Sequence, residues 1–195
     1  MTPIRAATSN RCEKMLRMSG EIDMNGWERR CAQAWAEFDG YDARGEAGEA
    51  DFRKRIGELA DELPQDSPVA AFERASAWDS TDHSGEAVAL YQEALALGLA
   101  GMRRRRAVIQ MSSSLRNIGR VAESVQLLTE EEQNHDPDAE LLADALSAFL
   151  ALCLADVGRE REAVSVALRA LAPHLPRYQR SVANYARLLL EPDPA

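Results

Sequence analysis

The feature of this sequence that most limits its fold is a pattern that occurs three times in the second half of the chain. Each copy has a Glu, a small residue, a larger or apolar residue four positions later, and a fourth position three residues beyond that. The copies are Glu86-Ala87 with Tyr91 and Ala94, Glu123-Ser124 with Leu128 and Glu131, and Glu162-Ala163 with Ala167 and Ala170. The small residues lie 37 and 39 residues apart, which is typical of stacked helix pairs.

A second helix is predicted upstream of each copy. Trp78, Leu115 and Leu154 each stand nine residues before the small residue, and Gly119 and Gly158 stand five residues before it in the second and third copies. The first copy has Asp82 at that place. Glycine adopts the left-handed conformation that ends many helices at little cost. Each unit is therefore predicted to be a helix, a tight turn and a second helix.

The segment from about 68 to 175 resembles the tetratricopeptide repeat, in a divergent form of the kind found in short bacterial arrays. The residues that match the family are Trp78, Ala87, Tyr91 and Ala94, then Gly119, Leu128 and Pro137, then Gly158, Ala163, Ala170 and Pro176. The resemblance implies an all-α fold, a right-handed superhelical array of antiparallel helix pairs, or α-solenoid. Two features depart from the family: the period exceeds its usual 34 residues, and Glu131 stands where a small residue is expected.

The domain organisation follows from these copies and their flanks. Residues 1–20 are expected to form a flexible tail, because they hold four basic residues and no continuous apolar stretch. Residues 21–66 are read as a degenerate helix pair with a long polar loop over 39–50. Residues 67–176 hold the three repeats, at about 68–101, 105–138 and 144–177. Residues 177–195 are expected to form a capping helix and a frayed end.

Composition narrows the classes of function. The chain has 195 residues, a net charge of -9 and no apolar run of the roughly 18 residues that a membrane helix needs, so neither a membrane nor nucleic acid is expected as a partner. Three cysteines at irregular spacing fit a reducing cytoplasm. No metal-ligand spacing, phosphate-binding loop or nucleophile constellation is recognisable, so neither an enzyme, a metal nor a cofactor is predicted.

Charge is distributed unevenly in the second repeat. Residues 101–120 include six arginines and no acid, whereas residues 121–140 include seven acids and no Lys or Arg. One interpretation is a pair of solvated faces that partly neutralise each other. The other interpretation uses the resemblance, which implies that the first helix of each pair lines a concave inner wall. The candidate partner-binding residues are then Arg103, Arg106, Ile109, Ser113, Arg116 and Asn117, with Arg177, Arg180, Asn184 and Tyr185 in the capping helix.

The sequence thus favours a module for protein–protein interaction that binds a peptide or partner protein in its concave groove. Because the arginine fork suits carboxylates, an acidic or C-terminal segment is the expected ligand. The Lys and Asn clamp that some family members use for chaperone tails is absent, since its positions hold residues such as Ile109 and Ser113. Two alternatives stay open: a homodimer without a peptide ligand, and a groove that the N-terminal helix of the chain fills.

Overall fold

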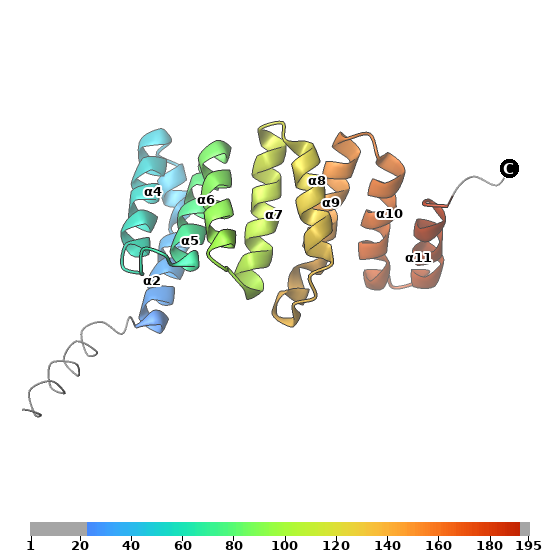
Figure 1. The fold of residues 1–195 in the computed structure, drawn as a ribbon, viewed down its shortest axis with the longest axis horizontal. Coiled ribbons are helices and arrows are strands. Elements are labelled where there is room, and N and C mark those ends of the chain that lie inside the picture. Colours follow the sequence, from blue (N-terminus) through green and yellow to red (C-terminus); the bar gives the residue numbers. More distant parts are fainter. Residues whose placement is uncertain (1–22, 192–195) are drawn as a thin grey trace, which may run out of the picture.

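The computed structural model describes residues 23–191, and this part of the chain consists of helices and short connections without a strand (Figure 1). The α-helices are α2 (Met24–Ala36), α3 (Phe38–Asp42), α4 (Glu46–Ala60), α5 (Pro68–Asp79), α6 (Ser84–Ala96), α7 (Gly101–Asn117), α8 (Val121–Glu132), α9 (Ala143–Asp156), α10 (Glu160–Leu171) and α11 (Gln179–Leu188). Two short 3-10 helices, η1 (Pro137–Leu142) and η2 (Ala172–His174), complete the set. The expected tail over 1–20 and the last four residues lie outside the described part.

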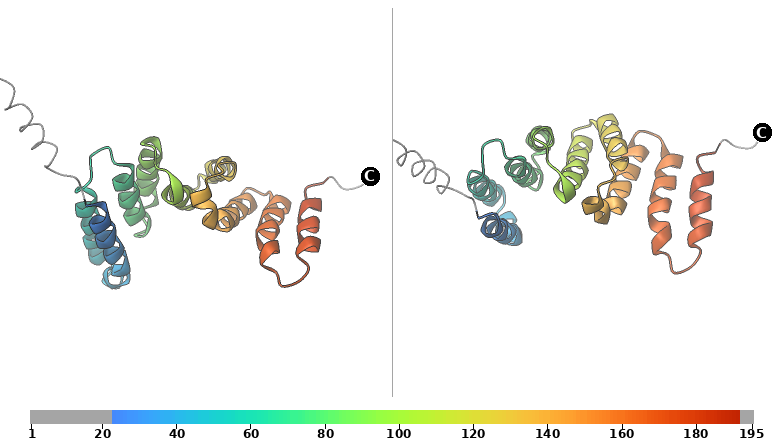
Figure 2. Two further views of the ribbon diagram at one scale, coloured as in Figure 1. Left: turned by 90° about the horizontal axis from the view of Figure 1, so that it is seen from below. Right: turned by 60° about the horizontal axis from the view of Figure 1, so that its bottom comes forward.

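Each helix packs against its neighbours in the chain, which gives an elongated array (Figures 1 and 2). The pairs α5–α6, α7–α8 and α9–α10 make the most extensive contacts. In addition, α5 contacts α7 and α7 contacts α9, whereas the backbones of α6, α8 and α10 do not approach one another closely within the described residues, although side chains of α8 and α10 meet at Glu132 and Arg169. Helices α5, α7 and α9 therefore form one continuous layer, and α6, α8 and α10 lie on the other side of it. This arrangement confirms the predicted helical solenoid.

The three turns within the pairs have one geometry. Gly119 and Gly158 have φ angles of 80° and 75°, and Asp82 takes the same left-handed conformation with φ 58°. The next amide in each turn donates to a carbonyl five residues earlier, as in the Arg120 to Leu115 bond of 2.8 Å. This bond closes the end of the first helix and reverses the chain. The turn positions predicted from the glycines, and from Asp82, are therefore observed.

The repeated small and apolar positions form the core between paired helices. Ala87, Tyr91 and Ala94 are fully buried in one hydrophobic cluster between α5, α6 and α7. Leu128 and Ala163 belong to a second cluster that extends from α7 to α10. The small residues let the backbones of neighbouring helices approach, so that the larger side chains interlock.

The prediction of a long polar loop over residues 39–50 is wrong. Residues 38–42 form α3 and residues from 46 onward form α4, so only three residues connect them. The glycines that suggested a loop have another role at Gly48, where an added Cβ would lie 2.0 Å from the carbonyl oxygen of Tyr41. The aromatic rings of Phe38 and Tyr41 also pack on Phe52, with centroids 4.8 and 5.5 Å away. Close packing against α4 therefore stabilises a helix that polar composition disfavours.

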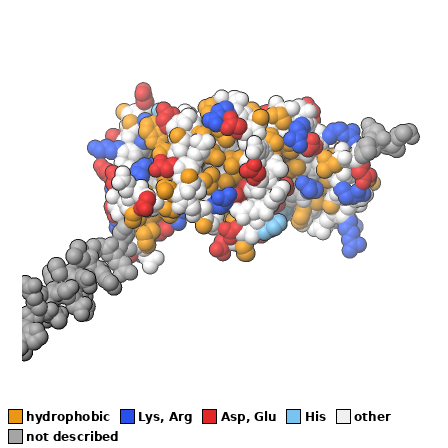
Figure 3. All heavy atoms as spheres, viewed as in Figure 1, with side chains coloured by type: hydrophobic (Ala, Val, Ile, Leu, Met, Phe, Trp, Pro, Cys, Tyr) orange, Lys and Arg blue, Asp and Glu red, His pale blue; other side chains and the backbone are white. Residues whose placement is uncertain are grey.

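The capping helix α11 is present, but it packs only on α10 and η2 and does not contact α9. The left-handed Tyr178, with φ 70°, precedes it and redirects the chain. Arginine side chains are conspicuous at this end of the face shown in Figure 3. Consequently α11 does not extend the α5–α7–α9 layer. This differs from the expectation that residues of the capping helix would continue the inner wall.

Candidate functional site

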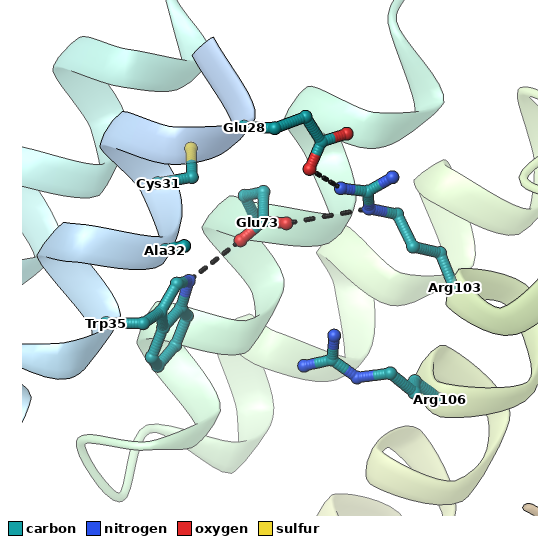
Figure 4. A pocket seen from close by; sticks show the side chains of 7 residues that line it. All are labelled: Glu28, Cys31, Ala32, Trp35, Glu73, Arg103 and Arg106. Carbon is teal, nitrogen blue, oxygen red and sulfur yellow. Dashed lines mark hydrogen bonds and ion pairs between the residues drawn. The ribbon is translucent and has the colours of Figure 1, made fainter. Parts of the chain in front are cut away.

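A pocket of about 350 Å³ opens where α2, α5 and α7 face one another (Figure 4). It is called the three-helix pocket here, and its lining residues are Glu28, Cys31, Ala32 and Trp35 from α2, Glu73 from α5, and Arg103 and Arg106 from α7. Helical periodicity explains this set. Glu28, Cys31 and Trp35 are spaced by three and four residues and so share one face of α2, and Arg103 and Arg106 are spaced by three residues and share one face of α7. The pocket thus joins one face from each helix.

A chain of polar contacts crosses the pocket. The indole nitrogen of Trp35 donates to Glu73 Oε2 at 2.9 Å, and Glu73 Oε1 lies 3.7 Å from Arg103 Nε. Arg103 Nη2 donates to Glu28 Oε2 at 2.6 Å. Burial raises the pKa of Glu73, which is only 5% exposed, although the Trp35 hydrogen bond and the charge of Arg103 oppose this shift. Arg103 therefore interacts with two carboxylates, those of Glu28 and Glu73.

Arg106 differs from Arg103 in making no ion pair with a carboxylate among the described residues, although its charge also helps to lower the pKa of Glu73. Its guanidinium carbon lies 5.2 Å from the centroid of the Phe72 ring, a cation–π distance, and the residue is exposed. Figure 4 shows both arginine side chains extending from α7 toward the same space. The pocket can consequently offer a cation to a ligand.

The thiol of Cys31 also lines the pocket. Burial, followed by the charges of Glu73 and Glu28, raises its pKa to about 12, so the thiol stays protonated at neutral pH. In residues 23–191 no group of three or more His, Cys, Asp or Glu side chains could hold a metal ion. The two arginines and two carboxylates of the pocket are groups suited to reversible binding of a charged ligand.

The other two members of the arginine run have structural contacts. Arg105 Nε donates to Glu131 Oε1 at 3.0 Å, and Arg104 Nε donates to Glu131 Oε2 at 3.1 Å. Arg105 Nη2 also donates to the carbonyl oxygen of Asn134 at 2.8 Å. Arg105 and Glu131 are 4% and 2% exposed. Glu131, the acid that departs from the repeat pattern, is therefore buried at the core position of the repeat because it forms an ion pair with the buried Arg105.

The predicted binding residues do not gather in one place. Arg103 and Arg106 line the three-helix pocket, whereas Ile109 belongs to the hydrophobic core and Ser113 is half-buried. Arg116, farther along α7, forms an ion pair with Asp156, in which Nη2 lies 3.3 Å from Oδ1. Asn117 lies beside it and donates weakly to Ser84 at 3.4 Å. At the C-terminal end, four predicted residues are exposed in helix α11 or just before it: Arg177, Arg180, Asn184 and Tyr185.

Sequence reasoning missed Glu28, Trp35 and Glu73. No feature of the sequence around Trp35 marks its indole as a hydrogen-bond donor to a distant carboxylate. Glu73 carried one unused signal, since it is the only acid among the residues of α5 that precede the terminal Asp79. A single acid inside a row of small and apolar residues indicates a buried carboxylate that needs a partner.

A half-buried carboxylate, Asp79, lies at the end of α5 outside the pocket. It accepts hydrogen bonds from Ser114 Oγ and, at 3.3 Å, from the Tyr91 hydroxyl. Burial raises its pKa, and these two hydrogen bonds counteract the shift only in part. A native pKa above the unfolded value means that the folded state binds more protons, so this group lowers stability as pH rises above about 4.

The substitution Asp79→Asn should therefore stabilise the protein at neutral pH. The amide oxygen can still accept from Ser114 or Tyr91, while the cost of burying a charge disappears. We expect the thermal midpoint to rise by about 2 to 4 °C at pH 7 and the difference to shrink toward pH 4, as measured by circular dichroism. Asp66→Asn, at an exposed position outside α5, is the control. A lower midpoint at pH 7 for Asp79→Asn would contradict the assignment.

The comparisons with known proteins agree with this architecture. The fold defines the class as a helical-repeat protein, built from stacked helix pairs. A family model described as Tetratrico peptide repeat matches residues 68–189, more than half of the chain, and the protein belongs to this family. Searches of curated proteins and of solved structures find no match. Helix α2 and the residues it brings to the pocket lie outside the matched segment.

Family membership supports a scaffold for protein–protein interaction, and proteins of this family are generally not enzymes. Such domains generally bind proteins or peptides. Among the described residues, no helix is both long and apolar enough to cross a bilayer.

Proposed function

We propose that this protein binds an extended segment of a partner protein along the layer formed by α5, α7 and α9. The observation that carries the proposal is the three-helix pocket, which places an exposed arginine beside buried polar groups on one edge of that layer. Farther along, α9 exposes Leu152, with 48% of its surface accessible, and the neighbouring Ala148 and Ala155. A ligand with a carboxylate at one end and apolar side chains beyond it would complement both parts.

The cytoplasm is the proposed location. Cys31 and Cys153, the two cysteines in the described residues, are free and buried, which suits a reducing compartment.

The proposal can be tested with a peptide selected on the wild-type protein from a random display library. Leu152→Arg should weaken binding of that peptide at least about tenfold, because it places an unpaired charge where apolar contact is expected. Val164→Arg is a matched control, since Val164 is also 48% exposed but lies on α10, on the other side of the array. Calorimetry measures both affinities. Equal weakening by both substitutions, or by Val164→Arg alone, would place the ligand elsewhere.

Homodimerisation is the second candidate function. It is favoured by the exposed apolar side chains at the C-terminal end, where Tyr178, Tyr185 and Leu190 are 73%, 65% and 51% exposed. Light scattering distinguishes it from the first candidate, because a monomer at tens of micromolar excludes it.

A further inference from the structure

The three-helix pocket holds two arginines and two glutamates, but both glutamates contact the same arginine. Two carboxylates, Glu28 and Glu73, share Arg103, while Arg106 contacts only an aromatic ring. The pairing is also imperfect at Arg103, because its Nε is buried and has no hydrogen-bond partner in the described structure. Glu28 contacts one terminal nitrogen of the guanidinium, although a carboxylate can engage two. The two arginines therefore still have N–H groups that a further carboxylate could accept hydrogen bonds from.

We infer that Glu28 is an internal substitute for a ligand carboxylate, and that a carboxylate of the bound partner displaces it to lie between Arg103 and Arg106. The inference rests on the proposed function and specifies the ligand group and the residue that competes with it. Arg103 and Arg106 lie three residues apart on α7, so their side chains share one helix face, and Figure 4 shows both guanidinium groups beside the open space.

The two carboxylates differ in how easily they can leave Arg103. Glu73 is 5% exposed and is held by the Trp35 indole, so it stays as the fixed partner that positions Arg103. The side chain of Glu28 is 43% exposed and is held by one ion pair at the edge of the pocket. Exposed ion pairs contribute little net stability, so exchanging one carboxylate for another on Arg103 costs little. Displacement of Glu28 then leaves its carboxylate in solvent.

A ligand cation is the competing occupant, since it could pair with Glu28 and Glu73. The contacts favour an anion, because both acids are already in contact with Arg103 whereas Arg106 is in direct contact with no acid among the described residues. Helix α2, which supplies Glu28, precedes the segment that matches the repeat family. The competition is therefore a property of this chain rather than of the repeat.

Succinate is a suitable probe, with binding followed by NMR through the Nε–Hε signals of Arg103 and Arg106 at low ionic strength. Both signals should shift in a saturable way. Glu28→Gln should tighten succinate binding about two- to fivefold, because the competitor is removed at constant shape. Arg106→Gln should weaken it at least about tenfold. Glu62→Gln, which removes another exposed carboxylate from an ion pair with Arg30, is the control for net charge and should change binding little.

Three outcomes would overturn the inference: no saturable shift in the Glu28→Gln variant, equal effects of Glu28→Gln and Glu62→Gln, or saturable binding of butylammonium that Arg106→Gln strengthens. None of these outcomes depends on the selected peptide, whose response to Leu152→Arg and Val164→Arg tests the proposed function separately. A peptide that still requires Leu152 while Glu28→Gln has no effect would leave the proposed function intact and remove this inference alone.

Discussion

Replacing Glu131 by Leu is expected to lower the free energy of unfolding by about 3 to 5 kcal/mol, because it leaves a buried guanidinium without its counter-charge. Glu131 accepts from Arg105 and Arg104 at 3.0 and 3.1 Å, and it is 2% exposed. Arg105, itself 4% exposed, would keep only its hydrogen bond to the carbonyl oxygen of Asn134. The loss should appear as a lower urea midpoint, followed by circular dichroism.

Two further variants separate this ion pair from a general effect on α8. Glu132→Ala removes the adjacent acid, whose side chain is 43% exposed and lies 3.7 Å from Arg169, and it should cost less than about 1 kcal/mol. The double substitution of Glu131→Leu with Arg105→Met should recover much of the stability, because apolar groups can replace a buried pair when both charges are removed. If Glu131→Leu costs no more than Glu132→Ala, the pair is not buried in solution.

The helix pairs and their turns could be predicted from the sequence because they depend on local information. A glycine five residues before the small residue sets a left-handed turn, and the four-residue step from Ala87 to Tyr91 sets one buried face. The helix α3 could not be predicted in this way. It depends on packing of Phe38 and Tyr41 against Phe52 of the next helix, and such tertiary contacts override a polar, glycine-containing segment.

The pocket could be predicted only in part, for a related reason. Helical periodicity identifies Arg103 and Arg106 as one face of α7, but Glu28 lies 75 residues from Arg103 in the chain. Pairing over that separation depends on how α2 and α7 meet in space. Glu131 was a usable signal, since an acid at a small core position requires a buried cation. The run of arginines before it then divides into two that face Glu131 and two that line the pocket.

Replacing Trp27 by Ala is expected to lower the free energy of unfolding by about 3 to 5 kcal/mol and to act mainly at the N-terminal end of the array. Trp27 is fully buried against Phe52 and Ile56, and its indole donates to the carbonyl oxygen of Leu59 at 2.7 Å. The substitution removes this large side chain from the contact between α2 and α4 and leaves the Leu59 carbonyl without its donor. Met24→Ala, at a 41% exposed position of the same helix, should have little effect.

The distribution of the effect along the chain distinguishes an array from a single cooperative core. In a helical-repeat protein each unit contacts only its neighbours, so hydrogen exchange should accelerate strongly in α2–α4 of the Trp27→Ala variant and little in α9 and α10. Equal acceleration in all helices would contradict that expectation. Local opening of this end removes the competing Glu28, but it also removes Trp35, whose indole holds Glu73 beside Arg103. Because Arg103 then loses its fixed position, we expect weaker succinate binding while α7 itself stays folded. Loss of the ligand site before loss of the repeats would therefore show that the segment preceding the matched repeats completes the site.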